Sequence, residues 1–477
     1  MNNSASEHDF VTPESEKLNL STKLAYGAGD LGSAITANIL VFYLSFFLTD
    51  VAGMGAALAG SVRMVSGIWD AINDPIVGVL SDRTRSRWGR RYPWMIFGAV
   101  PLGIFFFLHW IVPPFLTNSS TGNNQWGLFW YYIIIGVFFN TAFTAVNLPY
   151  TALTPELTKD YNERTSLNSF RFAFSIGGSI LSLVLAQIIF STIKDKSQQY
   201  LVLGGICALL CILPSYICIW GTRKRVATVK QQNPEEDNST SLPYLEQLRI
   251  AFTNRAFLFV IGIYLCSWLA VQTTATIIPY FVVNWMGLKP EVSAQVALGV
   301  QGTALLMLFP WTALSKRLGK KAVYFMGMSL WLIAQIGLFF LQPGQIGLMY
   351  FLAVLAGFGV STAYLIPWSM IPDVIELDEL NTGQRREGIF YGFMVLLQKI
   401  GLAIGLFIVG LALEAAKFIP GQQVQPDSAL FAIRVAIGPF PTVAVIGGLI
   451  LAYFYPLTRE VHAEIMLKLH ERRSQKM

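Results

Sequence analysis

Apolar residues occur in long runs along most of the chain, and short polar segments separate the runs. A helix needs roughly 20 mainly apolar residues to cross the hydrocarbon core of a bilayer. The pattern therefore predicts an all-α membrane protein with twelve transmembrane helices. The expected spans are residues 22–49, 57–80, 93–113, 126–152, 169–193, 200–220, 256–283, 292–314, 322–341, 345–371, 387–415 and 429–455.

Composition supports a lipid environment. Of the 477 residues, 54% are hydrophobic and 13% are charged, whereas soluble domains contain about 25% charged residues. Lys and Arg gather in both tails and in the loops on the same side of the expected spans, so both termini are expected in the cytoplasm. This asymmetry also explains the net charge of +6 without a nucleic-acid partner. We expect a multi-pass protein of the plasma membrane, which is the inner membrane in a bacterium.

The two halves of the chain carry matching segments. A basic turn follows the second span (residues 83–91) and another follows the eighth (residues 316–321), and a Pro-aromatic segment ends the fourth and the tenth spans. Such matches indicate two pseudo-symmetric six-helix bundles around a central path. The expected divisions are a tail (1–21), a bundle (22–220), a linker (221–255), a bundle (256–455) and a tail (456–477), in a monomer.

The second span contains three polar side chains on one helical face. Asp70, Asn73 and Asp74 are spaced i, i+3 and i+4, so they lie side by side. One Asp at the centre of a membrane helix costs about 2.5–3.5 kcal/mol on insertion scales, so the pair needs a positive partner. Pro75 lacks an N–H and frees the carbonyl of Ala71 as a further oxygen ligand. We expect a site for a coupling ion, Na⁺ or H⁺.

Two basic residues offer an alternative partner for these carboxylates. Arg63 lies seven residues before Asp70, and Lys399 lies in the middle of the eleventh span. A mid-span ammonium must face the protein interior, where it either pairs with the aspartates or binds the substrate. Asn147 in the fourth span is either a further cation ligand or part of a hydrogen bond between helices.

The first and fifth spans supply candidate substrate ligands. Asp30 lies within a glycine pattern, Gly27 to Gly32, that matches a dinucleotide fingerprint. No strand precedes this pattern, so its glycines are expected to serve helix packing. Arg171 opens the fifth span as either an interfacial anchor or a substrate ligand. No catalytic or zinc-binding arrangement is found in the sequence, so neither an enzyme nor a cofactor is expected.

The segment from Trp69 to Ile76, the segment from Thr84 to Gly89 and the mid-span Lys399 resemble the glycoside-pentoside-hexuronide:cation symporters of the major facilitator superfamily. The resemblance implies that Asp70 and Asp74 ligate Na⁺, H⁺ or Li⁺. It also implies that Lys399 and Arg171 match the family's lysine and its arginine near the sugar.

Residues 364–375 and 92–97 are also similar to the sodium-dependent lysophosphatidylcholine symporters. That resemblance implies that Tyr364 and Trp368 face the substrate, and that Lys399 or Arg171 meets a lipid phosphate.

The resulting hypothesis is cation-coupled symport of a sugar or glycoside by alternating access. The alternatives are Na⁺-coupled lysophospholipid symport and a non-transporting receptor or scaffold. Gating is expected at the charged residues that follow the spans of the repeat: Asp82, Arg83, Arg90, Arg91, Asp373 and Arg385.

Overall fold

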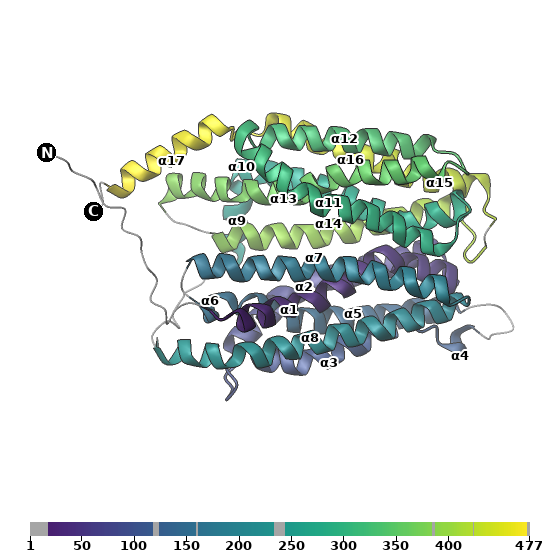
Figure 1. The fold of residues 1–477 in the computed structure, drawn as a ribbon, viewed down its shortest axis with the longest axis horizontal. Coiled ribbons are helices and arrows are strands. Elements are labelled where there is room, and N and C mark those ends of the chain that lie inside the picture. The colour runs from purple at the N-terminus through teal and green to yellow at the C-terminus, as the bar shows by residue number, and fades with distance from the viewer. Residues whose placement is uncertain are drawn as a thin grey trace.

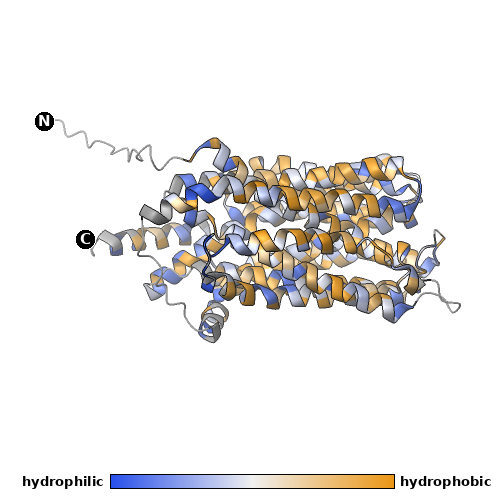
Figure 2. Ribbon diagram, turned by 90° about the horizontal axis from the view of Figure 1, so that it is seen from below, coloured by the Kyte–Doolittle hydropathy of each residue, from blue (hydrophilic) through white to orange (hydrophobic). Residues whose placement is uncertain are grey.

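The computed structural model describes residues 18–117, 124–158, 161–232, 244–383, 387–422 and 424–474. Within these ranges the chain forms helices and no β-strand, and the long helices run side by side along one axis (Figure 1). Figure 2 shows hydrophobic residues over the length of this bundle, with hydrophilic residues gathered mainly towards its ends.

The helices of the first half occupy one side of the bundle (Figure 1). They are α1 (Leu20–Ile39), extended by the π-helices η2 (Leu40–Leu44) and η3 (Phe47–Val51), α2 (Ala56–Arg83), α3 (Tyr92–Leu108), α4 (Pro114–Thr117), α5 (Gln125–Thr151), α6 (Thr154–Leu157), α7 (Tyr161–Thr192) and α8 (Lys196–Gln232).

The helices of the second half occupy the other side. They are α9 (Tyr244–Thr253), α10 (Arg255–Tyr280), extended by η4 (Phe281–Trp285), α11 (Pro290–Leu318), α12 (Lys320–Phe340), α13 (Ile346–Thr382), α14 (Glu387–Ala415), α15 (Asp427–Ile437), α16 (Pro439–Phe454) and α17 (Arg459–Ser474). We call the end of the bundle with α6, α9 and α17 the proximal end, and the end with α4 and α15 the distal end.

The predicted twelve-helix membrane fold is confirmed. Ten segments of the described chain are long and apolar enough to span a bilayer, and α15 and α16 together form one of them. The apolar α3 and the charge-bearing α2 complete the set. Several helices are longer than the expected spans. For example, α8 continues past residue 220 to Gln232, and α13 continues past residue 371 to Thr382.

The internal duplication is visible in the backbone. The first long helix of each half widens into a π-helix and then ends at a left-handed glycine, Gly53 (φ 67°) or Gly287 (φ 66°). In both halves the residue before this glycine, Ala52 or Met286, donates its N–H across 2.9 Å to the carbonyl five residues earlier. Glycine adopts this conformation without steric cost, so the same turn is built twice.

Small residues bring the two halves together through α2 and α14. A Cβ atom on Gly410 would lie 2.5 Å from the carbonyl oxygen of Ala56 and 3.0 Å from the Cα of Gly60. A Cβ on Gly67 would lie 2.7 Å from the Cβ of Ala403. Close backbone contact of this kind is a common way for membrane helices to associate.

Hydrogen bonds between the halves also lie in the distal part of the bundle. They join Ala57 N–H to Glu414 Oε2 (2.7 Å), Thr49 Oγ1 to the Tyr280 hydroxyl (2.8 Å), Gln301 Nε2 to Asn38 Oδ1 (2.8 Å) and Thr276 Oγ1 to the Val41 carbonyl (3.1 Å). The two halves are thus fastened to each other at the distal end.

We expect Gly410→Ala to open this distal contact, because the added methyl group meets backbone atoms that cannot rotate away. In purified protein with its four cysteines replaced by alanine, a cysteine placed at the buried Thr276 should react faster with a polar maleimide in the Gly410→Ala background. Gly392→Ala on the same helix is the control, since a Cβ there meets nothing within 4 Å. Equal labelling rates in the two backgrounds would contradict the close packing of α2 on α14.

Candidate cation and substrate site

Two carboxylates of α2 share one ammonium group of α14. The Lys399 Nζ atom lies 2.8 Å from Asp70 Oδ2 and 2.6 Å from Asp74 Oδ2. The two aspartates are one helical turn apart, so a side chain from the neighbouring helix reaches both. Of the two basic partners that the sequence left open, the structure selects Lys399 rather than Arg63.

Thr144 of α5 completes this group. Its hydroxyl donates to Asp74 Oδ1 at 2.9 Å and lies 3.4 Å from Asp70 Oδ1. Only the first is a good hydrogen bond, because a hydroxyl has one proton and O–H···O distances cluster near 2.7–2.8 Å. Thr144 was not predicted from the sequence, where its only signal is a hydroxyl one turn before Asn147.

The charges of this group do not balance. With all three side chains ionised, two carboxylates face one ammonium, which leaves one negative charge for a cation or a proton to neutralise. The side chains keep 21% (Lys399), 16% (Asp70) and 23% (Asp74) of their surface accessible. The site is therefore buried but not sealed, as an exchanging ion requires.

The two asparagines predicted as cation ligands do not contact the carboxylates. Asn73 is turned towards α5, where its Nδ2 lies 3.4 Å from the Asn140 carbonyl. Three residues along a helix correspond to 300°, so Asn73 projects to one side of Asp70. The Asn147 side-chain oxygen is buried without a hydrogen-bond partner, one turn beyond Thr144. Their predicted role as ligands stays a prediction without a contact to support it.

The predicted substrate residues Asp30 and Arg171 are brought to each other. The Arg171 Nε atom lies 3.4 Å from Asp30 Oδ2, which joins α7 to α1. The guanidinium also lies over the ring of Tyr150, 5.9 Å from its centroid, and the Tyr150 hydroxyl donates to the Tyr26 carbonyl. Of the two roles left open for Arg171, the inward-reaching one agrees with this geometry.

Tyr364 and Trp368 of α13 belong to a group of aromatic side chains in the second half. Trp268 packs against Tyr364 with ring centroids 5.6 Å apart, and Tyr264 packs against Trp368 at 5.8 Å. Tyr391 stacks on Trp368 at 6.0 Å. The sequence predicted the two residues of α13 but missed the other three, because they come from α10 and α14.

Each half carries an acid–base contact at its proximal end, at matching positions of the repeat. In the first half, Glu156 accepts from Arg90 Nε at 2.9 Å and from Arg91 Nε at 2.8 Å. In the second half, Lys320 Nζ lies 2.6 Å from Asp373 Oδ1. Each contact joins the basic turn to the acidic residue that follows the Pro-aromatic segment. The sequence named Arg90, Arg91 and Asp373 as gating residues but did not identify their partners.

The remaining predicted gating residues form no contact that can be described. Arg83 is exposed at the end of α2. The side chain of Asp82 and all of Arg385 lie outside the described residues.

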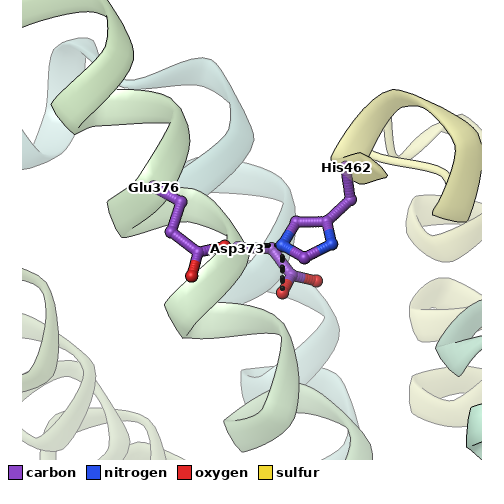
Figure 3. A group of neighbouring side chains, drawn as sticks. All are labelled: Asp373, Glu376 and His462. Atoms are coloured by element: carbon purple, nitrogen blue, oxygen red, sulfur yellow. Dashed lines mark hydrogen bonds and ion pairs between the residues drawn. The ribbon is translucent and has the colours of Figure 1, made fainter. Parts of the chain in front are cut away.

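A histidine of α17 joins the acid–base contact of the second half. Figure 3 shows His462 pointing at two acidic side chains of α13, with Nε2 at 2.5 Å from Glu376 Oε2 and 3.5 Å from Asp373 Oδ1. Three such ligand atoms within 4.8 Å of one another could hold a metal ion, but Lys320 already contacts both oxygens of Asp373. The group thus fastens α17 to α13.

Comparison with known proteins identifies symporters over nearly the whole chain. A Synechocystis protein described as an uncharacterized symporter is 54% identical, over 96% of this chain and 98% of its own length. The mouse sodium-dependent lysophosphatidylcholine symporter 1 is 27% identical, over 93% of this chain and 87% of its own. An Escherichia coli protein, YagG, described as a candidate glycoside/cation symporter, is 28% identical, with 93% of each chain covered.

Solved structures support the fold. The nucleoside transporter NupG superposes with a TM-score of 0.61 over 92% of this chain and 100% of its own, at 14% identity. Residues 25–459 match the family described as MFS/sugar transport protein. This chain therefore belongs to the MFS/sugar transport protein family and has the major facilitator fold.

Proposed function

We propose that this protein is a secondary active transporter that couples the inward movement of a cation, Na⁺ or H⁺, to that of a sugar or glycoside. The observation that carries the proposal is the Lys399 ammonium shared by Asp70 and Asp74 inside an apolar bundle. The two carboxylates carry one more negative charge than the ammonium balances, and this excess charge favours binding of a small cation. The symporters among the relatives support the same reading.

In this mechanism the coupling ion and Lys399 compete for the same oxygens. A cation bound between Asp70 and Asp74, with the Thr144 hydroxyl as a further ligand, weakens the hold of the carboxylates on the ammonium. The Lys399 ammonium can then donate to a substrate hydroxyl. Cation and substrate therefore favour each other's binding, and the effect is equal in both directions.

The substrate side of the proposal is supported by aromatic and charged groups of both halves. The rings around Trp368 present flat faces on which a sugar ring can pack. The Asp30–Arg171 pair offers both acceptors and donors for hydroxyl groups. The family description, which names sugar transport, agrees with this class of substrate.

Alternating access follows from how the halves are joined. We place both termini in the cytoplasm of a plasma membrane, so the proximal end faces inward. The contacts between the halves at the distal end then close the outer side. The proximal acid–base contacts lie within each half and leave the halves free to separate there. We take the transporting unit to be a monomer with residues 22–220 and 256–455 as its two moving bundles.

Lysophospholipid symport is a second candidate function. A groove of about 290 Å³ opens between α2 and α14, and its lining is Ile68, Ala71, Ile72, Pro75, Leu396 and Ile400. An acyl chain fits such an apolar lining, which adjoins Asp70 and Asp74 in sequence. The mouse relative, named for sodium-dependent lysophosphatidylcholine symport, supports the same candidate.

We expect Asp74→Asn to reduce cation-driven uptake by about 10- to 100-fold, because the amide cannot balance the charge of a bound cation. Uptake into proteoliposomes with and without a Na⁺ or H⁺ gradient measures the effect, and an unchanged melting temperature shows that the variant is folded. Asp427→Asn, at an exposed position of α15, should transport as the parent does. Full gradient dependence in Asp74→Asn would remove this residue from the cation site.

We expect Lys399→Met to make stability depend on the cation. Loss of the ammonium leaves two neighbouring carboxylates unpaired, at a cost of about 1–3 kcal/mol for a partly exposed group. The melting temperature should fall in Na⁺-free buffer at pH 8. Addition of NaCl or a lower pH should then raise the melting temperature of Lys399→Met by more than it raises the melting temperature of the parent. The reason is that a ligand that binds the folded state adds stability.

Choline chloride controls for ionic strength in this measurement, and Lys289→Met, at an exposed lysine, controls for the substitution. If neither Na⁺ nor protons stabilise Lys399→Met more than the parent, the proposed competition for the carboxylates is wrong.

A substrate screen should separate the candidate functions. We expect labelled glycosides to accumulate in proteoliposomes under a Na⁺ or H⁺ gradient. Accumulation of labelled lysophosphatidylcholine in place of glycosides would favour the second candidate. Absence of gradient-driven uptake of either class would favour the receptor or scaffold alternative.

A further inference from the structure

A mixed polar and apolar groove lies at the proximal end of the second half, apart from the cation and substrate site. Its volume is about 900 Å³, within the range of roughly 300–1,000 Å³ that is typical of small-ligand sites. The helices that border it are α9, α10 and α13, which meet at the proximal end (Figure 1). Their contributions include Glu246 and Arg249 from α9, Arg255 from α10, and Asp378 and Thr382 from the end of α13.

The groove lies where the membrane helices end. Ala256 and Pro456 line it, and the seventh expected span begins at residue 256 while the twelfth ends at residue 455. In the proposed orientation, this is the level of the lipid headgroups on the cytoplasmic side. The apolar Ile250 and Leu377 also line the groove, and the nearby Phe252 of α9 keeps 45% of its surface exposed. A lipid in this position contacts both polar and apolar surface.

The two arginines of the groove are exposed and form no ion pair with any acidic side chain that the structure describes. Arg255 begins α10, and its guanidinium lies 5.9 Å from the centroid of the Phe259 ring. Arg249 lies on α9, at the facing side of the same groove. A guanidinium binds a phosphate group through paired N–H donors, so two guanidinium groups in one groove favour a phosphate-bearing ligand.

The groove also carries negative charge. Glu246, in the first turn of α9, is exposed and forms no ion pair within the described part of the chain. Asp378 lies one turn before Thr382, where α13 ends, and the carbonyl groups at the end of a helix add partial negative charge. The two basic and two acidic side chains therefore balance. A purely anionic ligand would use only the basic groups, whereas a zwitterion matches both signs.

We propose that this groove binds the headgroup of a phospholipid that carries both a phosphate and a primary ammonium, as phosphatidylethanolamine does. Arg249 and Arg255 contact the phosphate, and Glu246 accepts a hydrogen bond from the ammonium. The bound headgroup joins α9, which belongs to the segment between the two halves, to α10 of the second half. This lipid site goes beyond the proposed symport.

The test compares lipids that have the same acyl chains and differ only in the headgroup. Native mass spectrometry of the full chain in detergent measures the dissociation constant for phosphatidylethanolamine, phosphatidylcholine and phosphatidylglycerol. Phosphatidylcholine keeps a positive charge but has no N–H to donate, and phosphatidylglycerol has no ammonium. The parent should bind phosphatidylethanolamine about 2- to 5-fold more tightly than either, which is the range of a solvent-exposed ion pair.

Two variants separate the two ends of the headgroup. Arg255→Gln should weaken the binding of all three lipids by about 2- to 5-fold, because all three carry the phosphate. Glu246→Gln should weaken only phosphatidylethanolamine and reduce its preference to about one. Lys289→Gln, which removes an exposed positive charge far from the groove, is the matched control and should bind the three lipids as the parent does.

The proposal is overturned if the parent binds the three lipids equally, or if Glu246→Gln keeps the preference for phosphatidylethanolamine. Displacement of the lipid by an equal concentration of glycerophosphoethanolamine would also overturn it, because the groove would then hold a soluble molecule rather than a lipid. Binding is measured without a gradient or a transported substrate. A failure of the proposed symport therefore leaves this lipid site unaffected, and a failure of the lipid site leaves the symport unaffected.

Discussion

The low tolerance of an apolar bundle for uncompensated charge is the constraint on which the rest of this structure depends. Asp70 and Asp74 lie in α2, and the ammonium of Lys399 comes from α14 in the other half of the chain. The group that stabilises these charges therefore also links the two halves. In the proposed mechanism, a cation bound between the aspartates therefore alters a contact between the two bundles.

Duplication supplies the framework in which this link can act. The first long helix of each half ends in the same π-helical turn, and each half carries an acid–base contact at its proximal end. The acid–base contact thus joins helices within each half at the proximal end. The groups proposed to bind cation and substrate are divided between the halves, because the aspartates belong to α2 and the aromatic group belongs mainly to α10 and α13.

The sequence predicted the parts of this structure that depend on local pattern. Apolar runs located the helices, and helical spacing placed Asp70 and Asp74 on one face. It could not decide between Arg63 and Lys399, because the choice depends on which helix packs against α2, and that packing is set by Gly60, Gly67 and Gly410.

The same limit applies to partners on other helices. Thr144, Glu156 and Lys320 are ordinary residues in their own segments and become relevant only when the helices assemble. Asn73 shows a related case, because its predicted role as a cation ligand rests on helical spacing alone, and its amide nitrogen lies 3.4 Å from the Asn140 carbonyl of α5. A rotation of 60° around a helix axis is enough to change its neighbours.

The attachment of α17 has a practical consequence. His462 fastens this helix to Glu376, and Arg472 donates to the Leu380 carbonyl, so α17 is attached to α13 of the second half. A fluorophore on α17 and another on α6 would therefore each report on a different bundle. The energy transfer between them would test the proposed movement of the two bundles, without a label between the bundles.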